Sequence, residues 1–344
     1  MRVFFTVQHP AHVHFFRNTI EKLQADGHAT HVFVRERPMA LVLLEHYGID
    51  YEVLAGRFDS NVKMLFGQLK YEINLFRKVR RLDPDLIATI GEPAAAHASK
   101  LFDVESLIFT DTEHATLTNT FAFPFADRIY TPECYEDDVG PKQIRYPGYH
   151  ELAYLHPDRF EPDPSILSEV GIDPEERFVI LRLVDWNAVH DIGDSGFTDV
   201  ASVVESLEGT GVRVFITAEG ELPEAVERYQ VPVEPHRIHH LMYYADLFIG
   251  ESATMATESA VLGTPGIFVA TGHLGYTTEL EEKYELLYNF PGPKRQTQGI
   301  EKAISILENY DQSLWDRRRE RMLDDKIDTT EFIMSEILSH EARS

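Results

Sequence analysis

Short runs of β-branched and aromatic residues alternate along this chain with longer runs in which apolar residues recur at helical spacing. This alternation is typical of β-α-β units, in which helices connect the parallel strands of one sheet. In the first half it predicts strands at 3–7, 30–34, 51–54, 85–90, 106–110 and 128–130, and helices at 13–25, 39–47 and 61–82. The chain should therefore begin with a parallel α/β domain.

The alternation stops between residues 146 and 177, where five prolines and few apolar runs predict a linker. It then resumes, with strands expected at 178–183, 213–217, 246–249 and 266–269 and helices at 197–207, 238–244 and 253–262. A chain of 344 residues is long enough for two such domains. We predict an α/β fold with a Rossmann-like N-terminal domain (1–145), the linker (146–177), a Rossmann-like C-terminal domain (178–310) and C-terminal helices (311–344). Packing of those last helices back on the N-terminal domain is one arrangement we consider.

The chain is strongly acidic, with 57 Asp and Glu against 32 Lys and Arg and a net charge of −25. So many carboxylates repel one another at low salt, whereas concentrated salt screens them over a few Å. The balance predicts a halophilic protein of a salt-rich cytoplasm, with an ordinary acidic protein as the alternative. The negative field also argues against nucleic acid as a partner.

Two further features favour a cytoplasmic location. Cys134 is the single cysteine, so no intrachain disulfide can form. The apolar run at the N-terminus is too short for a signal peptide, and no stretch approaches a transmembrane helix.

Residues 57–82 depart from the acidic composition, with seven basic and two acidic residues in an amphipathic helical pattern. A basic amphipathic helix can lie on an anionic membrane surface. Peripheral contact with the inner membrane face is therefore one interpretation. A helix packed on the core with a solvated basic face is the other.

The most informative segment is 244–265, where a buried strand ends at Gly250 and small and hydroxyl residues begin a helix. The free N–H groups and the dipole of a helix N-terminus attract anions. Ser252 or Thr254 can cap that end and also donate to a phosphate oxygen. Glu258, one and a half turns further on, can accept hydrogen bonds from ribose hydroxyls. An ordinary strand–helix unit with a serine cap is the alternative.

Residues 238–269, with the spacing of Glu258 followed by Ala260, Leu262-Gly263 and Pro265, resemble the donor-binding segment of GT-B glycosyltransferases. Non-hydrolysing UDP-N-acetylglucosamine 2-epimerases share that fold. The resemblance implies that Glu258 holds the ribose, that Ser252, Thr254 and Met255 border the diphosphate, and that the backbone near Ile238 faces the base. It also implies two domains facing a cleft.

Over its whole length the chain resembles domain of unknown function family 354, a prokaryotic set of the GT-B superfamily. This resemblance rests on 9–16 (HPAHVHFF), 111–114 (DTEH) and 146–149 (YPGY).

Polar residues follow the predicted strands of the first domain, at the sheet edge where ligands bind in open α/β folds. His12 occupies the position of a family histidine near the acceptor, which suggests a general base; a structural histidine or a metal ligand are alternatives, although the spacing is not typical of zinc. Asp111 or Glu113 could be the base instead, or could orient His12. The remaining substrate-side candidates in this domain are Gly91, Glu92 and His114. A simpler interpretation of Glu92 is that it stabilises a helix N-terminus.

In the second domain the loop after residue 183 lacks the paired glycines of those transferases, so Asn187 and His190 are candidate donors to a pyrophosphate or sugar. His273, after the strand at 266–269, is a further candidate. The segments that would form the site contain no Asp-x-Asp pair, so we expect neither a metal nor a cofactor besides the nucleotide sugar.

The sequence thus favours a glycosyltransferase that moves a sugar from a nucleotide diphosphate, with UDP as the favoured carrier, to a glycan or lipid-linked acceptor. A UDP-N-acetylglucosamine 2-epimerase and a non-catalytic nucleotide-sugar-binding protein are the alternatives.

Overall fold

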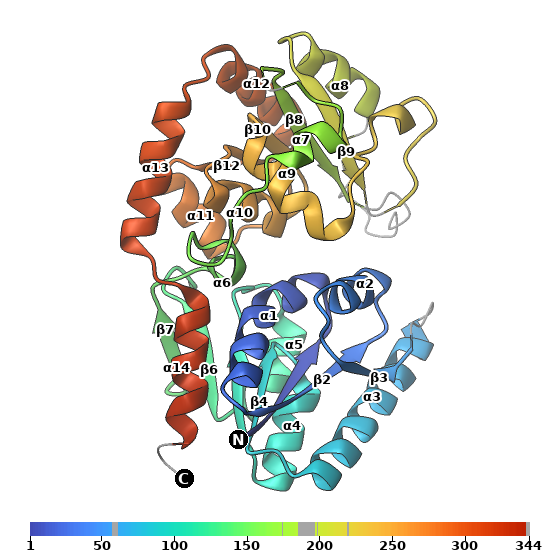
Figure 1. Ribbon diagram of the computed structural model, residues 1–344, viewed down its shortest axis with the longest axis vertical. Coiled ribbons are helices and arrows are strands. Elements are labelled where there is room, and N and C mark those ends of the chain that lie inside the picture. The colour runs from blue at the N-terminus through green and yellow to red at the C-terminus, as the bar shows by residue number, and fades with distance from the viewer. Residues whose placement is uncertain (57–60, 174, 185–196, 198, 219, 342–344) are drawn as a thin grey trace. The chain divides into compact units, whose positions relative to one another are not determined.

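The computed structural model describes residues 1–56, 61–173, 175–184, 197, 199–218 and 220–341, and Figure 1 shows its helices and strands. The chain divides into two compact units. Unit 1 comprises Met1–Arg159 and Lys326–Ser344, and unit 2 comprises Phe160–Asp325. The segment 146–177, expected as a linker, is shared between them. Its first part belongs to unit 1 because Tyr146, Tyr149 and Tyr154 are fully buried there.

Unit 1 is built on a seven-stranded parallel sheet of order β3-β2-β1-β4-β5-β6-β7. Its strands are β1 (Arg2–Val7), β2 (Ala29–Arg35), β3 (Tyr51–Ala55), β4 (Leu86–Ile90), β5 (Glu105–Phe109), β6 (Arg128–Pro132) and β7 (Gln143–Tyr146). The first six lie where the alternating pattern predicts them. We did not predict β7, a four-residue edge strand with only two apolar side chains.

Helices cover both faces of this sheet because adjacent strand residues point to opposite sides. Phe4 of β1 packs in a cluster with Tyr71, Leu75 and Val79, whereas Phe5 contacts Phe16 at a ring distance of 5.1 Å. The helices of unit 1 are α1 (Pro10–Ala25), α2 (Pro38–His46), α3 (Asn61–Leu82), α4 (Pro93–Phe102), α5 (Thr116–Ala122), α6 (Leu152–Leu155) and α14 (Thr329–Glu341).

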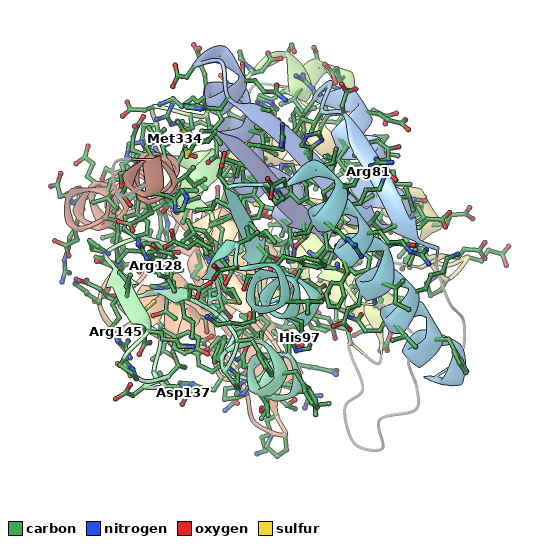
Figure 2. The ribbon with its side chains drawn as sticks, turned by 90° about the horizontal axis from the view of Figure 1, so that it is seen from below. Arg81, His97, Arg128, Asp137, Arg145 and Met334 are labelled. Carbon is green, nitrogen blue, oxygen red and sulfur yellow. The ribbon has the colours of Figure 1, made fainter. Side chains whose placement is uncertain are left out.

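The last helix, α14, packs on α1 and α6 of unit 1 and is also joined to the sheet through charged side chains. Arg128 of β6 lies 2.9 Å from a carboxylate oxygen of Glu105 and 3.3 Å from one of Glu336, and the hydroxyl of Tyr130 donates to Glu336 at 2.7 Å. Figure 2 labels Arg128 together with Met334 of α14.

Helix α3 packs on the core, as the second interpretation of residues 57–82 expects, and also exposes apolar side chains. Tyr71, Leu75 and Val79 pack into the core, so one side of the helix is structural. On its other side Phe66 is 67% exposed, and Leu69 and Ile73 are also exposed. Within the part of the chain that the structure describes, no helix is both long enough and apolar enough to cross a membrane.

Unit 2 contains a five-stranded parallel sheet of order β12-β11-β10-β8-β9. Its strands are β8 (Phe178–Leu183), β9 (Arg213–Ala218), β10 (Leu247–Gly250), β11 (Gly266–Phe268) and β12 (Leu287–Asn289), the last of which was not predicted. Its helices are α7 (Ser165–Glu169), α8 (Val200–Glu208), α9 (Ile238–Tyr244), α10 (Ala253–Leu262), α11 (Gly275–Glu282), α12 (Arg295–Glu308) and α13 (Gln312–Asp325), with short 3-10 turns η1 (Glu227–Tyr229) and η2 (Pro235–Arg237).

Each sheet has a point where the chain reverses the direction in which it adds strands. In unit 1 this point lies between β1 and β4, and in unit 2 between β8 and β10. Ligands of open α/β sheets bind beyond the carboxyl ends of the strands at such a point. The topology therefore directs attention to the residues that follow β1 and β4, and to those that follow β8 and β10.

Candidate functional site

The turn from β10 to α10 lies at the reversal point of the unit 2 sheet. Ser252 is extended and caps α10, with its hydroxyl oxygen accepting the N–H of Met255 at 3.4 Å. Thr254 and Met255 are half-buried in the first turn of this helix. The helix thus begins at the carboxyl edge of the sheet with a cap bond that is longer than usual. Helix N-termini of this kind attract anions.

Gly250 makes this turn possible because it lies against the neighbouring strand. A Cβ atom at this position would stand 2.6 Å from Cβ and 2.8 Å from the carbonyl oxygen of Arg182. A larger residue would push β10 away from β8. The close approach also means that the Arg182 side chain leaves its strand directly beside the turn, so this arginine joins the candidates in unit 2.

Glu258 lies on a buried turn of α10 and is paired with a histidine of α9. Its Oε1 is 2.9 Å from Nε2 of His239, and the two side chains are only 6% and 4% exposed. Ile238, the first residue of α9, is half-buried. The carboxylate expected to hold a ribose is therefore held in place by a neighbouring imidazole before any ligand binds.

The other candidates of unit 2 lie in different surroundings. His273 is exposed and its ring contacts the hydroxyl of Thr278 at 3.3 Å. Glu251 accepts the backbone N–H groups of Val184 at 3.0 Å and Phe197 at 2.8 Å, at the carboxyl end of β8. Asn187 and His190 lie outside the described residues.

In unit 1, His12 is half-buried in the first turn of α1, which His9 caps. Its Nδ1 accepts the backbone N–H of Gln8 at 3.3 Å. Burial, and then the nearby His9 and His150, lower the pKa of His12 to about 3, and Asp111 opposes this only in part. The imidazole is consequently neutral near pH 7.

Asp111, which follows β5, pairs with His150 from the segment after β7. Their Oδ2 and Nδ1 atoms are 3.0 Å apart, and Thr112 donates to the other carboxylate oxygen at 2.8 Å. Burial alone would raise the pKa of Asp111, but His150 and these hydrogen bonds lower it below its usual value. The carboxyl group of Asp111 is therefore ionised near neutral pH. The Nε2 atom of His150 is buried and has no hydrogen-bond partner among the described residues.

Glu113 lines a cavity of about 500 Å³ in unit 1. One of its carboxylate oxygens accepts the N–H of Glu136 at 3.2 Å, and the amide of Asn119 donates to the hydroxyl of Tyr135 at 3.4 Å. Burial raises the pKa of Tyr135, and the nearby acids Glu113, Asp137 and Asp111 raise it further. The remaining lining residues are Thr116, Thr120, Phe123, Pro124, Asp137, Val139, Pro141 and Lys142.

The loop between β6 and β7 forms one side of this cavity and is held by Arg145. Its guanidinium donates to the carbonyl oxygens of Glu133 at 3.0 Å and Asp137 at 2.8 Å, and also to that of Tyr135. Figure 2 labels Arg145 and Asp137. His114, in contrast, is exposed beyond β5.

Gly91 and Glu92 form the turn after β4, where Gly91 has a φ of +52°. Glu92 is 4% exposed and caps α4, accepting the N–H of Ala94 and the amide of Gln68, both at 3.1 Å. Burial raises the pKa of this carboxyl group. These contacts support the structural interpretation of Glu92.

The residues that we predicted as site residues do not form a metal cluster among the described positions. The group there with suitable ligand spacing is His156, Asp158 and Asp328. Asp328 is bound by the guanidinium of Arg159 at 2.7 Å, which already balances its charge.

Sequence reasoning missed His150 as a partner of Asp111 and did not pair His239 with Glu258. His150 follows the 146–149 signature directly, and His239 lies one helix before Glu258. The position of these two histidines beside the recognised motifs is the sequence signal that could have identified them as site residues. Spacing along the chain alone does not show which acid each histidine meets.

Residues 1–330 match the protein family described as "Protein of unknown function (DUF354)". The uncharacterized protein MJ0665 of Methanocaldococcus jannaschii is 22% identical over 269 residues, covering 74% of this chain and 78% of that protein.

Among solved structures, the UDP-GlcNAc 2-epimerase of Neisseria meningitidis bound to UDP-GlcNAc has a TM-score of 0.70, with 13% identity and all of both chains covered. The Streptomyces sp. SF2575 glycosyltransferase SsfS6 has a TM-score of 0.61, with 12% identity and 97% of this chain and 99% of that chain covered. At such identities the similarity establishes the α/β fold of GT-B type with two Rossmann-like domains. The chain therefore belongs to the DUF354 family, with a GT-B fold.

Proposed function

We propose that this protein transfers a sugar from a nucleotide diphosphate, with UDP as the favoured carrier, to an acceptor hydroxyl. Unit 2 binds the donor and unit 1 binds the acceptor. The single observation that carries the proposal is the turn from β10 to α10. It combines a capped helix N-terminus with a buried, positioned carboxylate at the reversal point of a parallel sheet.

On the donor side, the first turn of α10 meets the diphosphate through backbone N–H groups and through Ser252 and Thr254. Glu258, oriented by His239, accepts the ribose hydroxyls, and the backbone at Ile238 lies against the base. Arg182, which leaves β8 beside Gly250, supplies positive charge for the phosphates. Met255, Asn187, His190 and His273 remain proposed ligand contacts.

On the acceptor side, the cavity lined by Glu113 provides the binding space, and His12, Asp111 and Glu113 provide polar groups near the reacting hydroxyl. In the reaction the acceptor oxygen bonds to the anomeric carbon while the bond from that carbon to the phosphate oxygen breaks. The hydroxyl proton passes to a basic group, and the nucleoside diphosphate leaves with the electron pair.

A panel of nucleotide sugars and nucleoside diphosphates in molar KCl tests the donor proposal. A UDP-sugar at a hundredfold excess over its Kd should stabilise the protein by about 2.7 kcal/mol and raise its melting temperature by about 5–10 °C. Incubation of the best donor with acceptor sugars and lipid-linked glycans then tests transfer. The absence of any nucleotide-dependent shift would contradict the whole proposal. A shift without turnover would favour a non-catalytic binding protein.

A UDP-N-acetylglucosamine 2-epimerase is a second candidate because Asp111 and Glu113 place two carboxylates after β5, where proton abstraction from a sugar carbon could take place. This reaction needs no acceptor. Incubation with UDP-N-acetylglucosamine alone, followed by NMR of the sugar, separates the two reactions. Appearance of the C2 epimer without acceptor would replace the transferase proposal.

For a lipid-linked acceptor, we propose that the protein is cytoplasmic and that the exposed side of α3 contacts the inner face of the membrane. Apolar contact survives in concentrated salt, whereas attraction of basic residues to anionic lipid is screened. Phe66→Ser should therefore weaken sedimentation with anionic vesicles in molar KCl by about tenfold, given ~1.5–3 kcal/mol for burying a phenylalanine side chain. Leu101→Ser on α4 is the control, since Leu101 is 62% exposed. Equal effects of both substitutions would contradict a specific role for α3.

A further inference from the structure

His12 holds its ring in an orientation that decides which nitrogen carries the proton. Its Nδ1 accepts the backbone N–H of Gln8 at 3.3 Å, so a neutral ring at this position has its proton on Nε2. A lone pair on Nε2 would require the proton on Nδ1, where it would face the Gln8 N–H. The backbone of the turn after β1 therefore favours one tautomer.

The carboxylate that would make His12 a strong base is held by another histidine. In a base-and-carboxylate pair, the carboxylate accepts a hydrogen bond from the N–H of one ring nitrogen and leaves the other nitrogen as a proton acceptor. Here Asp111 makes that contact with Nδ1 of His150 at 3.0 Å, and its other oxygen accepts from Thr112. His150 is itself fixed by its ring contact with Phe15, at a centroid distance of 4.4 Å.

We propose that His12 acts as a neutral hydrogen-bond donor, offering Nε2–H to an oxygen atom of the acceptor bound in unit 1, and that it does not accept the proton of the acceptor hydroxyl. The assignment rests on the proposed function for the identity of the ligand, but the state of the ring can be measured without it. Under this assignment another basic group removes the proton of the acceptor hydroxyl, and Glu113, which lines the cavity, is the candidate.

The charged groups around His12 favour this state. His9 precedes it on the same turn, Asp111 faces it from the end of β5, and His150 faces it from the segment after β7. Burial, with the two histidines, outweighs the attraction of Asp111 and lowers the pKa of His12 to about 3. A ring with a depressed pKa stays neutral at working pH, so Nδ1 remains free of a proton and Nε2 carries the single N–H.

Long-range ¹H–¹⁵N spectra of protein labelled at histidine nitrogens test the state of the ring directly, with His12→Gln identifying the signal. We expect a protonated Nε2, an unprotonated Nδ1, and no titration between about pH 7 and about pH 5. A proton on Nδ1, or titration near pH 6.5, would overturn the assignment. His150→Gln should raise the pKa of His12, because it removes a neighbour that depresses it. An unchanged titration in that variant would show that the Asp111–His150 pair does not control His12.

Two variants test the donor role in turnover. The side-chain amide of His12→Gln retains an N–H near the position of Nε2, whereas His12→Phe has none. We expect kcat/KM to fall about tenfold or more in His12→Phe and to fall less in His12→Gln. Equal losses in both would indicate a proton acceptor and overturn the proposal. If no sugar is transferred at all, the proposed function fails, while the spectra still decide the state of His12.

Discussion

Glu258→Gln should weaken the binding of UDP by about 5- to 150-fold, which corresponds to roughly 1–3 kcal/mol. The carboxylate is buried and lies 2.9 Å from Nε2 of His239. Under the proposed function it accepts the ribose hydroxyls of the nucleotide. Glutamine preserves the size of the side chain but removes the charge and replaces one acceptor oxygen with a donor. The ribose hydroxyls would then lose a charge-assisted acceptor.

Isothermal titration with UDP measures this effect, and the melting temperature of each unliganded variant shows whether folding is also changed. Glu301→Gln is the matched control, because Glu301 is exposed on α12. The same affinity in Glu258→Gln and in the parent protein would remove Glu258 from the ribose site. A comparison of UDP with 2′-deoxy-UDP should show a smaller preference in Glu258→Gln than in the parent.

The sequence predicted the architecture well because hydrophobic periodicity determines which segments can be buried strands and helices. Helices α3, α9 and α10 begin and end where the pattern predicts. Strands β7 and β12 were not predicted because they are edge strands of four and three residues, and such short runs carry little periodic signal. The prolines of 146–177 indicated irregular backbone, but not that its first part would be buried against unit 1.

The candidate site was less predictable, because it depends on contacts between residues distant in sequence. The motif around Ser252 and Glu258 could be located from local spacing alone. The pairing of Asp111 with His150 joins the ends of two different strands, and it changes the expected chemistry of His12. A family resemblance places such residues in the same region, but it does not determine which carboxylate each imidazole meets.

Arg128→Met should lower the free energy of unfolding of unit 1 by about 3 kcal/mol, because it removes the cation that Glu105 and Glu336 share. The three side chains are only 16%, 19% and 23% exposed, so solvent compensates for the loss incompletely. The imidazole of His340 remains as a partner of Glu105. Tyr130, which donates to Glu336, cannot replace the positive charge. Methionine retains much of the apolar stem and thus isolates the electrostatic contribution.

Hydrogen exchange and urea unfolding in molar KCl measure the result, and faster exchange should appear first in α14, which carries Glu336. Arg81→Met provides the control, because Arg81 is an exposed arginine of α3 (Figure 2). Since partly buried pairs are screened less than exposed ones, concentrated KCl should only partly reduce the difference between the two variants. Equal unfolding midpoints in Arg128→Met and Arg81→Met would mean that apolar packing on α1 and α6, rather than the arginine, holds α14 to the sheet.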